Sequence, residues 1–193
     1  MRPMDKKDFI LASGSPQRRM LLEQIGMTPK EIVRPDIDES EHAGEAPIAY
    51  VKRMAREKAK RAVQLRPNEN ILACDTIVAV GRRILHKAEN AEEQARVMRL
   101  LSGNTSRVLS AVCVISRQGK IAERLSVSRV QTKPLSAEEI AAYVAGKEWE
   151  GCSGYKIEGS FAAYVKRIVG SYSGIVGLPL FETKNLLNGI GVG

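Results

Sequence analysis

The chain has 193 residues, 44% of them hydrophobic and 27% charged, a balance typical of globular proteins. Because 30 lysines and arginines face 22 acidic residues, the formal net charge is +8, which favours an anionic partner such as a phosphorylated ligand or nucleic acid. No apolar run approaches the roughly 20 residues of a membrane helix, and three widely spaced cysteines argue against a disulfide framework or zinc cluster. We therefore expect a cytoplasmic protein of one domain, residues 1–193, without a membrane partner.

The first predicted elements are a short strand and a helix. Residues 9–12 are apolar and predict a buried strand, and the Ser-Pro pair that follows indicates a helix from residue 16 to about residue 25. Arg18 lies in the first turn of this helix, on its apolar face. The positive end of a helix dipole disfavours a cation there unless an anion is bound. Arg18 is therefore a candidate anion-binding residue, the alternative being a surface arginine beside a serine cap.

A second helix is predicted from residue 47 to residue 64, and it carries a lysine on its apolar face. At about 100° per residue, Lys58 falls inside the stripe formed by Val51, Met54 and their apolar neighbours. One interpretation is that its stem covers the core while the amine reaches water. The other is an amine that projects into a cleft and binds a phosphate.

Asp75 interrupts the most apolar part of the sequence. Residues 71–74 and 77–80 predict strand segments, broken by Asp75 and Thr76 and followed by a turn at residues 81–83. A carboxylate in such a run has to be paired, protonated, bound to metal or placed at a strand end that opens on a cleft. A catalytic or binding role competes here with a structural ion pair to an arginine.

The remaining elements complete an alternation of helices and strands. We expect a helix over 91–101, two strands over 107–116 and 121–132 joined by a hairpin, a helix over 136–145, an irregular glycine-rich segment over 146–159, a strand over 162–169, a loop over 170–174 and a helix over 180–187. The hairpin requires an antiparallel pair. The pattern therefore predicts an α/β domain with a mixed, twisted sheet flanked by helices.

Several common functional motifs are missing. The sequence has neither a G-x-x-x-x-G-K-[ST] phosphate loop nor a G-x-S-x-G nucleophile elbow. No run of Lys or Arg exceeds two residues, and only 5% of the residues are aromatic. These features disfavour nucleic acid as the partner and leave a small phosphorylated ligand.

Four segments, in this order, fit one known pattern: residues 11–19 (LASGSPQRR), 55–59 (AREKA), 74–78 (CDTIV) and 170–180 (GSYSGIVGLPL). Together they resemble the Maf family of nucleoside triphosphate pyrophosphatases, over nearly the whole chain. The resemblance implies a mixed-sheet α/β fold with two lobes around a deep cleft, often as a homodimer. It also implies divalent-metal-dependent cleavage of a nucleoside triphosphate to the monophosphate and pyrophosphate.

Residue roles follow from the same resemblance. By motif, Ser13, Arg18, Lys58 and Lys87 would hold the triphosphate. Asp75 would be the catalytic carboxylate, and Glu39 together with Asp75 would bind Mg²⁺ or Mn²⁺. These residue types suit attack of water on a phosphorus atom, because a carboxylate can activate the water and a hard cation neutralises the phosphates.

The positions that resemble substrate-specificity residues are Gln17, Thr76 and Glu158. Arg usually stands at the Gln17 position in the dTTP/UTP branch of the family, and Gln at the Glu158 position. Lys156 and Glu158 resemble the 7-methyl-GTP branch, whereas Thr76 and residues 170–180 resemble the dTTP/UTP branch. Ala88 also replaces the proline that commonly follows the Lys87 position.

The leading hypothesis is hydrolysis of nucleoside triphosphates, with dTTP/UTP or other non-standard nucleotides as substrates. One alternative is a 7-methyl-GTP pyrophosphatase. Another, from a different class, is a regulator of cell division that binds nucleotides or nucleic acid without turnover.

Overall fold

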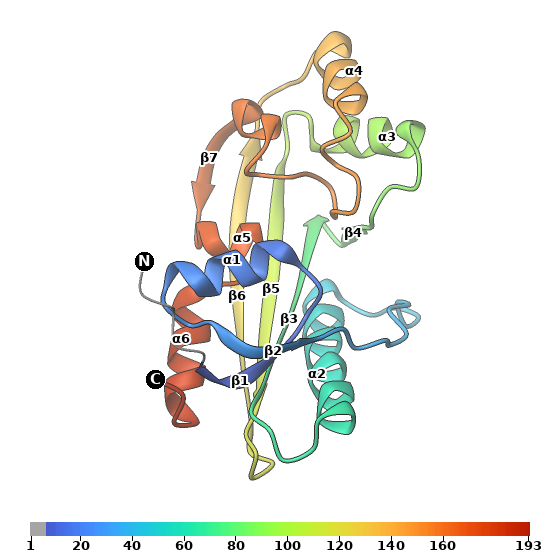
Figure 1. Ribbon diagram of the computed structural model, residues 1–193. Helices are drawn as coiled ribbons and strands as arrows, with labels where there is room; N and C mark the ends of the chain where they lie inside the picture. Colours follow the sequence, from blue (N-terminus) through green and yellow to red (C-terminus); the bar gives the residue numbers. More distant parts are fainter. Residues whose placement is uncertain (1–6) are drawn as a thin grey trace.

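The structure, a computed structural model, describes residues 7–193, which form seven strands, six α-helices and one 3-10 helix (Figure 1). The strands are β1 (Lys7–Ala12), β2 (Pro29–Val33), β3 (Ile71–Val80), β4 (Arg83–Leu85), β5 (Thr105–Ile115), β6 (Ile121–Thr132) and β7 (Val165–Val169). The α-helices are α1 (Pro16–Gln24), α2 (Pro47–Leu65), α3 (Ala91–Leu101), α4 (Ala137–Ala145), α5 (Tyr172–Val176) and α6 (Leu180–Gly189), and the 3-10 helix is Ser160–Tyr164.

All seven strands belong to one mixed sheet. Its order is β2-β1-β3-β5-β6-β7, and the short β4 pairs with the end of β3. β1 runs parallel to β2 and β3, whereas every other pairing is antiparallel. The α/β class with a mixed sheet flanked by helices is thus confirmed. Within residues 7–193, no helix has the length and apolar character needed to span a membrane.

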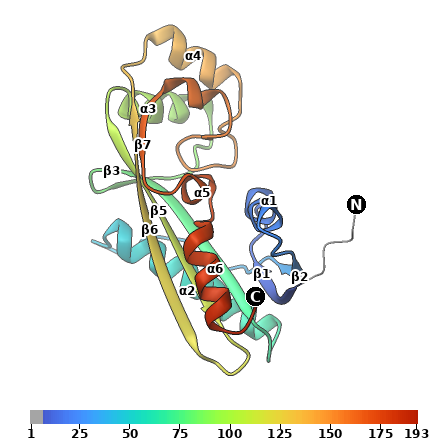
Figure 2. The same cartoon turned by 90° about the vertical axis from the view of Figure 1, so that its left-hand side faces the viewer.

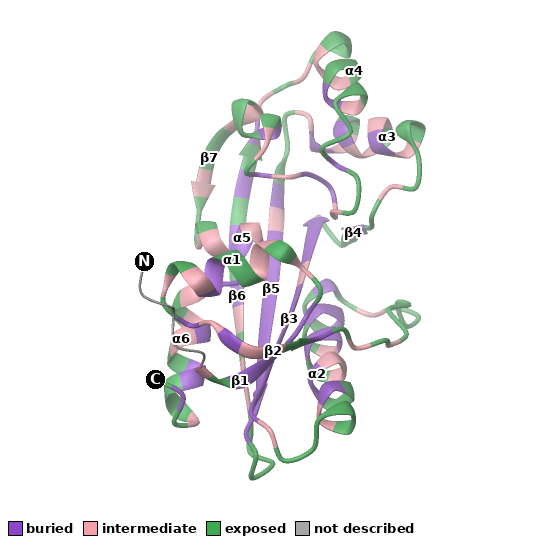
Figure 3. Cartoon of the chain, in the orientation of Figure 1, coloured by how far each residue is buried: buried purple, intermediate pink, exposed green. Residues whose placement is uncertain are grey.

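Three apolar clusters hold the layers together. Because side chains alternate along a strand, the odd-numbered residues of β3 and β5, such as Ile71 and Leu109, pack against α2 on one face of the sheet. Even-numbered residues such as Leu72 and Val112 pack against α1 and α6 on the other face, where Figure 2 shows α6 lying along β5 and β6. Farther along this second face, α3, α4 and residues 149–161 pack on Val108 and form a second lobe. Buried residues follow β3 and β5 through both lobes (Figure 3).

The two edges of β3 differ in how much of their length is paired with another strand, and this difference positions the site. β5 pairs with β3 from Ile71 to Ala79, but β1 pairs with it only from Ile71 to Ala73. On the β1 side, pairing resumes at Val78, which faces β4. Residues 74–77 therefore have one edge that no strand covers. This gap lies beyond the carboxyl end of β1, the place where open α/β sheets commonly bind ligands.

The expected interruption of the strand at Asp75 and Thr76 is wrong. β3 is continuous over ten residues, because β5 supplies an antiparallel partner opposite both of these positions. The polar pair marks the uncovered edge and leaves the strand intact. Asp75 points to the α2 face, and Thr76 to the opposite face, as the alternation of side chains requires.

Other differences concern short elements. β2 and β4, five and three residues long, are not predicted, because neither is long enough for a periodic pattern. The loop expected over 170–174 contains the start of α5, which Ser171 caps by accepting a hydrogen bond from the Gly174 N–H. The strand expected from residue 162 begins at Val165, because residues 160–164 form the 3-10 helix.

Candidate active site

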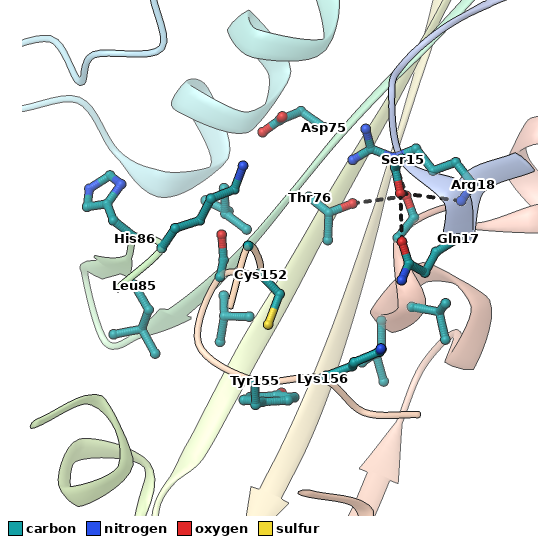
Figure 4. Close-up of a pocket in the computed structure, with 18 of the residues that line it drawn as sticks. Ser15, Gln17, Arg18, Asp75, Thr76, Leu85, His86, Cys152, Tyr155 and Lys156 are labelled. Carbon is teal, nitrogen blue, oxygen red and sulfur yellow. Dashed lines mark hydrogen bonds between the residues drawn. The ribbon is translucent and has the colours of Figure 1, made fainter. Parts of the chain in front are cut away.

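A cavity of about 570 Å³ lies beside the uncovered edge of β3, in the size range of small-molecule sites. The β1–α1 loop, α2, the segment after β4 and the 146–159 loop all contribute to its walls (Figure 4). Eight of the nine predicted site residues line it: Gln17, Arg18, Glu39, Lys58, Asp75, Thr76, Lys87 and Glu158. The ninth, Ser13, is buried behind Arg18. The structure thus brings residues from six separate segments to one place.

Lys58 forms the centre of a charged cluster on the α2 side of this cavity. Its ammonium lies 2.6 Å from Asp75 Oδ1 and 2.8 Å from Glu39 Oε1. The Lys58 and Asp75 side chains are 13% and 11% exposed, whereas that of Glu39 is 54% exposed. Asp75 does form an ion pair, as the competing interpretation required, but its partner is a lysine that also lines the cavity and not an arginine.

The pKa values of this cluster reflect burial and the neighbouring charges. Burial by itself lowers the pKa of Lys58, but the charge and hydrogen bond of Asp75, together with those of Glu39, outweigh it and raise that pKa above its ordinary value. For Glu39, burial raises the pKa. The hydrogen bond and charge of Lys58, together with the charges of Lys87 and Arg18, lower it by a larger amount. Its net pKa lies below the ordinary value, so Lys58 and Glu39 are both charged at neutral pH.

Arg18 is fixed at both ends of its guanidinium. Its Nε donates to the Gly177 carbonyl at 2.9 Å, and its Nη1 donates to the Ser13 hydroxyl at 2.9 Å. The Gly177 carbonyl also accepts from the Thr76 hydroxyl at 3.2 Å and from the Cys74 thiol at 3.3 Å. One backbone carbonyl therefore positions a cation from α1 and two side chains from β3. Guanidinium N–H groups not used in these bonds remain available to an anion.

The loop before α1 has the features of an anion site. Ser15 caps the helix by accepting from the Arg18 N–H, and its own hydroxyl donates to Gln17 Oε1 at 3.2 Å. The Gln17 amide nitrogen is left to act as a donor. Ser13 Oγ accepts from Arg18 and from the Ser15 N–H at 3.2 Å, so its hydroxyl proton can still be donated.

The wall opposite Arg18 comes from residues 148–158. It contributes two carboxylates, Glu148 and Glu150, the partly buried Cys152 and the cation Lys156, and Figure 4 shows Tyr155 and Lys156 at this side of the cavity. Lys87 is exposed, and its backbone forms an isolated bridge with Ser153, which attaches the segment after β4 to this wall. Lys87, predicted to hold phosphate, and Glu158, predicted to set specificity, therefore face one hollow.

Hydrogen bonds and aromatic packing attach this wall to the helices of the second lobe. The buried Gln94 of α3 donates to the Gly154 carbonyl at 2.8 Å, and the buried Tyr143 of α4 accepts from the Lys156 N–H at 3.2 Å. Between them, the Tyr155 ring stacks on Phe161 at a centroid distance of 4.1 Å. A segment without helix or strand is thus held by hydrogen bonds to two buried side chains and by aromatic packing.

Sequence reasoning assigned no role to several residues that build the site. Gly177 lies within the segment 170–180 that carries the family resemblance, but nothing in the pattern shows that its carbonyl meets Arg18. Glu148, Glu150 and Tyr155 lie in a segment without periodicity. A Cβ at Gly159 would lie 2.1 Å from Glu148 Oε2, so a side chain there would displace a carboxylate that accepts hydrogen bonds from the Ser160 N–H and hydroxyl.

Comparisons with known proteins show which family the chain belongs to. A protein of Mesorhizobium japonicum named dTTP/UTP pyrophosphatase is 47% identical over 190 residues, covering 95% of this chain and 91% of the relative. Proteins with the same name from Rhodopseudomonas palustris and Rhodospirillum rubrum are 46% and 48% identical, covering 97% and 95% of this chain and 94% and 88% of their own lengths. The family model described as Maf-like protein matches residues 8–190. The chain therefore belongs to the Maf-like protein family.

Proposed function

We propose that this chain hydrolyses nucleoside triphosphates to the nucleoside monophosphate and pyrophosphate. The observation that carries this proposal is a buried carboxylate, Asp75, on the uncovered edge of β3, within a cavity that the cations Arg18, Lys58 and Lys87 also line. The names of the relatives, dTTP/UTP pyrophosphatase, support the same reaction.

The side chains suit hydrolysis without a covalent intermediate. Asp75 is the group that we expect to orient the attacking water and accept its proton, as general-base catalysis requires. Arg18 and Lys87 face the hollow from different walls, where they can neutralise the charge that grows on the departing pyrophosphate. Because Ser13 and Gly177 already hold Arg18 in place, little reorganisation is needed when the phosphates bind.

The carboxylates fit a divalent ion such as Mg²⁺ or Mn²⁺. Within residues 7–193, no group of three His, Cys, Asp or Glu side chains could hold a metal. However, Mg²⁺ is commonly bound by one or two carboxylates together with substrate phosphates, and Glu39 and Asp75 supply that number of carboxylates next to one cationic group. Such an ion, held by Glu39 and Asp75, would neutralise the phosphates.

We propose dTTP and UTP as the preferred nucleotides. The relatives' names support this, as does Thr76, which lines the cavity at a position that resembles the dTTP/UTP branch and shares the Gly177 carbonyl with Arg18. Gln17 can donate its amide N–H to a base, and Glu158 can accept from one. Cleavage of 7-methyl-GTP remains the competing prediction, since Lys156 and Glu158 face the same cavity.

The experiment is release of pyrophosphate from dTTP, UTP, CTP and 7-methyl-GTP, each with Mg²⁺ or Mn²⁺. Asp75→Asn keeps the shape of the side chain and its hydrogen bond to Lys58 but removes the base, so we expect kcat to fall by about 10²- to 10⁴-fold. Circular dichroism establishes that the variant is folded. Full activity in a folded Asp75→Asn protein, or no turnover of any triphosphate by the wild type, contradicts the proposal.

We also propose that the protein works in the cytoplasm. The three cysteines are all free, as is usual in a reducing compartment. The homodimer implied by the family resemblance stays a prediction, and light scattering after size-exclusion chromatography tests it.

A further inference from the structure

The cation that holds the two proposed metal-binding carboxylates is a side chain of the protein itself. Lys58 contacts both Glu39 and Asp75, and within residues 7–193 neither carboxylate forms a salt bridge with another lysine or arginine. An ammonium has three N–H donors, and two of them are engaged here. Lys58 is thus the counter-ion of this pair in the structure.

This arrangement conflicts with a simple phosphate-binding role for Lys58. A divalent ion on Glu39 and Asp75 would lie within a few ångströms of the ammonium and repel it. At the same time, two charge-assisted hydrogen bonds draw Lys58 toward the carboxylates. The ammonium cannot stay hydrogen-bonded to both carboxylates and also leave them free to bind a divalent cation.

The other cations of the cavity do not share this conflict. Arg18 is bound to Ser13 and Gly177, neither of which carries a charge. Lys87 is exposed, and no salt bridge of Lys87 occurs within the described residues. Both act on Glu39 only through space, by lowering its pKa.

We propose that Lys58 is exchanged between two partners during binding. In the free protein its ammonium occupies the carboxylate pair and opposes a divalent ion there. A bound triphosphate offers the ammonium phosphate oxygens, so Lys58 moves toward them and leaves Glu39 and Asp75 available. Ion and nucleotide therefore favour each other's binding, and by linkage each increases the affinity for the other by the same factor. This inference rests on the proposed function, because it takes a triphosphate as the ligand.

The test measures Mn²⁺ binding to the whole protein without nucleotide, from the electron paramagnetic resonance signal of unbound Mn²⁺. Lys58→Met keeps most of the side-chain volume and removes the charge, so we expect it to bind Mn²⁺ at least about fivefold more tightly than the wild type, the lower end of typical coupling between sites. Lys87→Met is the matched control, because it removes one positive charge from the same cavity without touching either carboxylate. A smaller change is expected for it.

A second measurement follows the exchange itself. Mn²⁺ binding is repeated with a saturating dUTP analogue that has a methylene group between the α and β phosphorus atoms and cannot be cleaved there. The analogue contributes its own phosphate ligands in every variant, so the comparison between variants isolates Lys58. We expect the analogue to increase Mn²⁺ affinity by a smaller factor in Lys58→Met than in Lys87→Met.

Removal of Lys58 leaves two neighbouring carboxylates unpaired and can lower stability. Lys58→Gln is therefore measured beside Lys58→Met, since it retains N–H donors without the charge, and the same tightening is expected. The proposal is overturned if both Lys58 variants bind Mn²⁺ no more tightly than Lys87→Met, or if the analogue increases Mn²⁺ affinity equally in all proteins. Because Mn²⁺ binding needs no turnover, absence of pyrophosphate release would count against the proposed function alone.

Discussion

The two cations that break apolar helical faces, Arg18 and Lys58, differ in how the fold holds them. Both positions could be singled out from the sequence, because a charge on a buried face requires a partner. The partners themselves could not, since Gly177 is 159 residues away from Arg18 along the chain. Asp75 shows the same limit, because an apolar run reveals that its carboxylate is unusual but not which cation it meets.

Cys152 provides a residue-scale prediction about the wall of the cavity. Burial raises the pKa of its thiol to about 11, so little thiolate is present at neutral pH. The thiolate is the reactive form, and we therefore expect slow alkylation by iodoacetamide at pH 7.5 and faster alkylation as the pH rises toward 11. Mass spectrometry of digested protein measures the modified fraction.

The same experiment carries its own controls. Cys74 and Cys113 are fully buried and should stay unmodified while the protein is folded. A non-cleavable nucleotide should slow modification of Cys152 further, because this residue lines the cavity. Rapid alkylation at pH 7.5 would contradict the prediction and show that the 146–159 loop does not shield the Cys152 thiol.

Among the helices and strands, the sequence predicted the position of those whose apolar pattern repeats over many residues. The helices α2, α3 and α4 and the β5–β6 hairpin lie close to their predicted ranges, because each carries a repeated apolar pattern or a capping box. The 146–159 loop gives no such signal. Its shape depends on Gln94 and Tyr143, which belong to helices that the loop only meets in the folded protein.

The Tyr143 hydroxyl is expected to position this loop and so to affect nucleotide binding. Tyr143→Phe leaves the partly buried Lys156 N–H without its acceptor, at a cost of about 0.5–1.5 kcal/mol. We expect KM for the preferred nucleotide to rise severalfold, the preference among nucleotides to narrow and kcat to change little. Steady-state kinetics with two nucleotides separates these effects.

Tyr164→Phe is the matched control for this prediction. Tyr164 packs edge-on against Phe161 in the same aromatic cluster, but its hydroxyl donates to the Glu139 carbonyl and not to the loop. Its removal should lower stability slightly without changing nucleotide preference. Equal kinetic effects of the two substitutions would show that the Tyr143 hydroxyl has no positioning role.

For the whole molecule, the α/β class follows from the alternation of elements, but the path of the sheet does not. The long strands β3, β5 and β6 run through both lobes. Each carries side chains that belong to the three apolar clusters or are partly buried against them. Short strands at the margin, such as β2, depend on pairing with β1 and have little signal of their own. We infer that the two lobes unfold together.

Leu109 tests this cooperativity, because it is fully buried in β5, in the apolar cluster that packs against α2 and not in the second lobe. Leu109→Ala should lower the free energy of unfolding by about 2–5 kcal/mol, whereas Ile121→Ala, at a position 47% exposed, should cost far less. The single tryptophan, Trp149, lies in the second lobe and reports on it by fluorescence. Its unfolding curve should coincide with that from circular dichroism, and an earlier fluorescence transition would show independent lobes.

The wall formed by residues 148–158 has a further consequence for how nucleotide choice can change. It is one continuous stretch of chain, whereas Arg18, Lys58 and Asp75 all lie before residue 88. A transplant of this stretch from a relative, with the Gln94 and Tyr143 anchors kept, would leave the hydrolytic groups untouched. The share of nucleotide choice that this stretch sets, through residues such as Glu158, is therefore separable from the chemistry by engineering, whereas the share of Gln17 and Thr76 is not, because they adjoin Arg18 and Asp75.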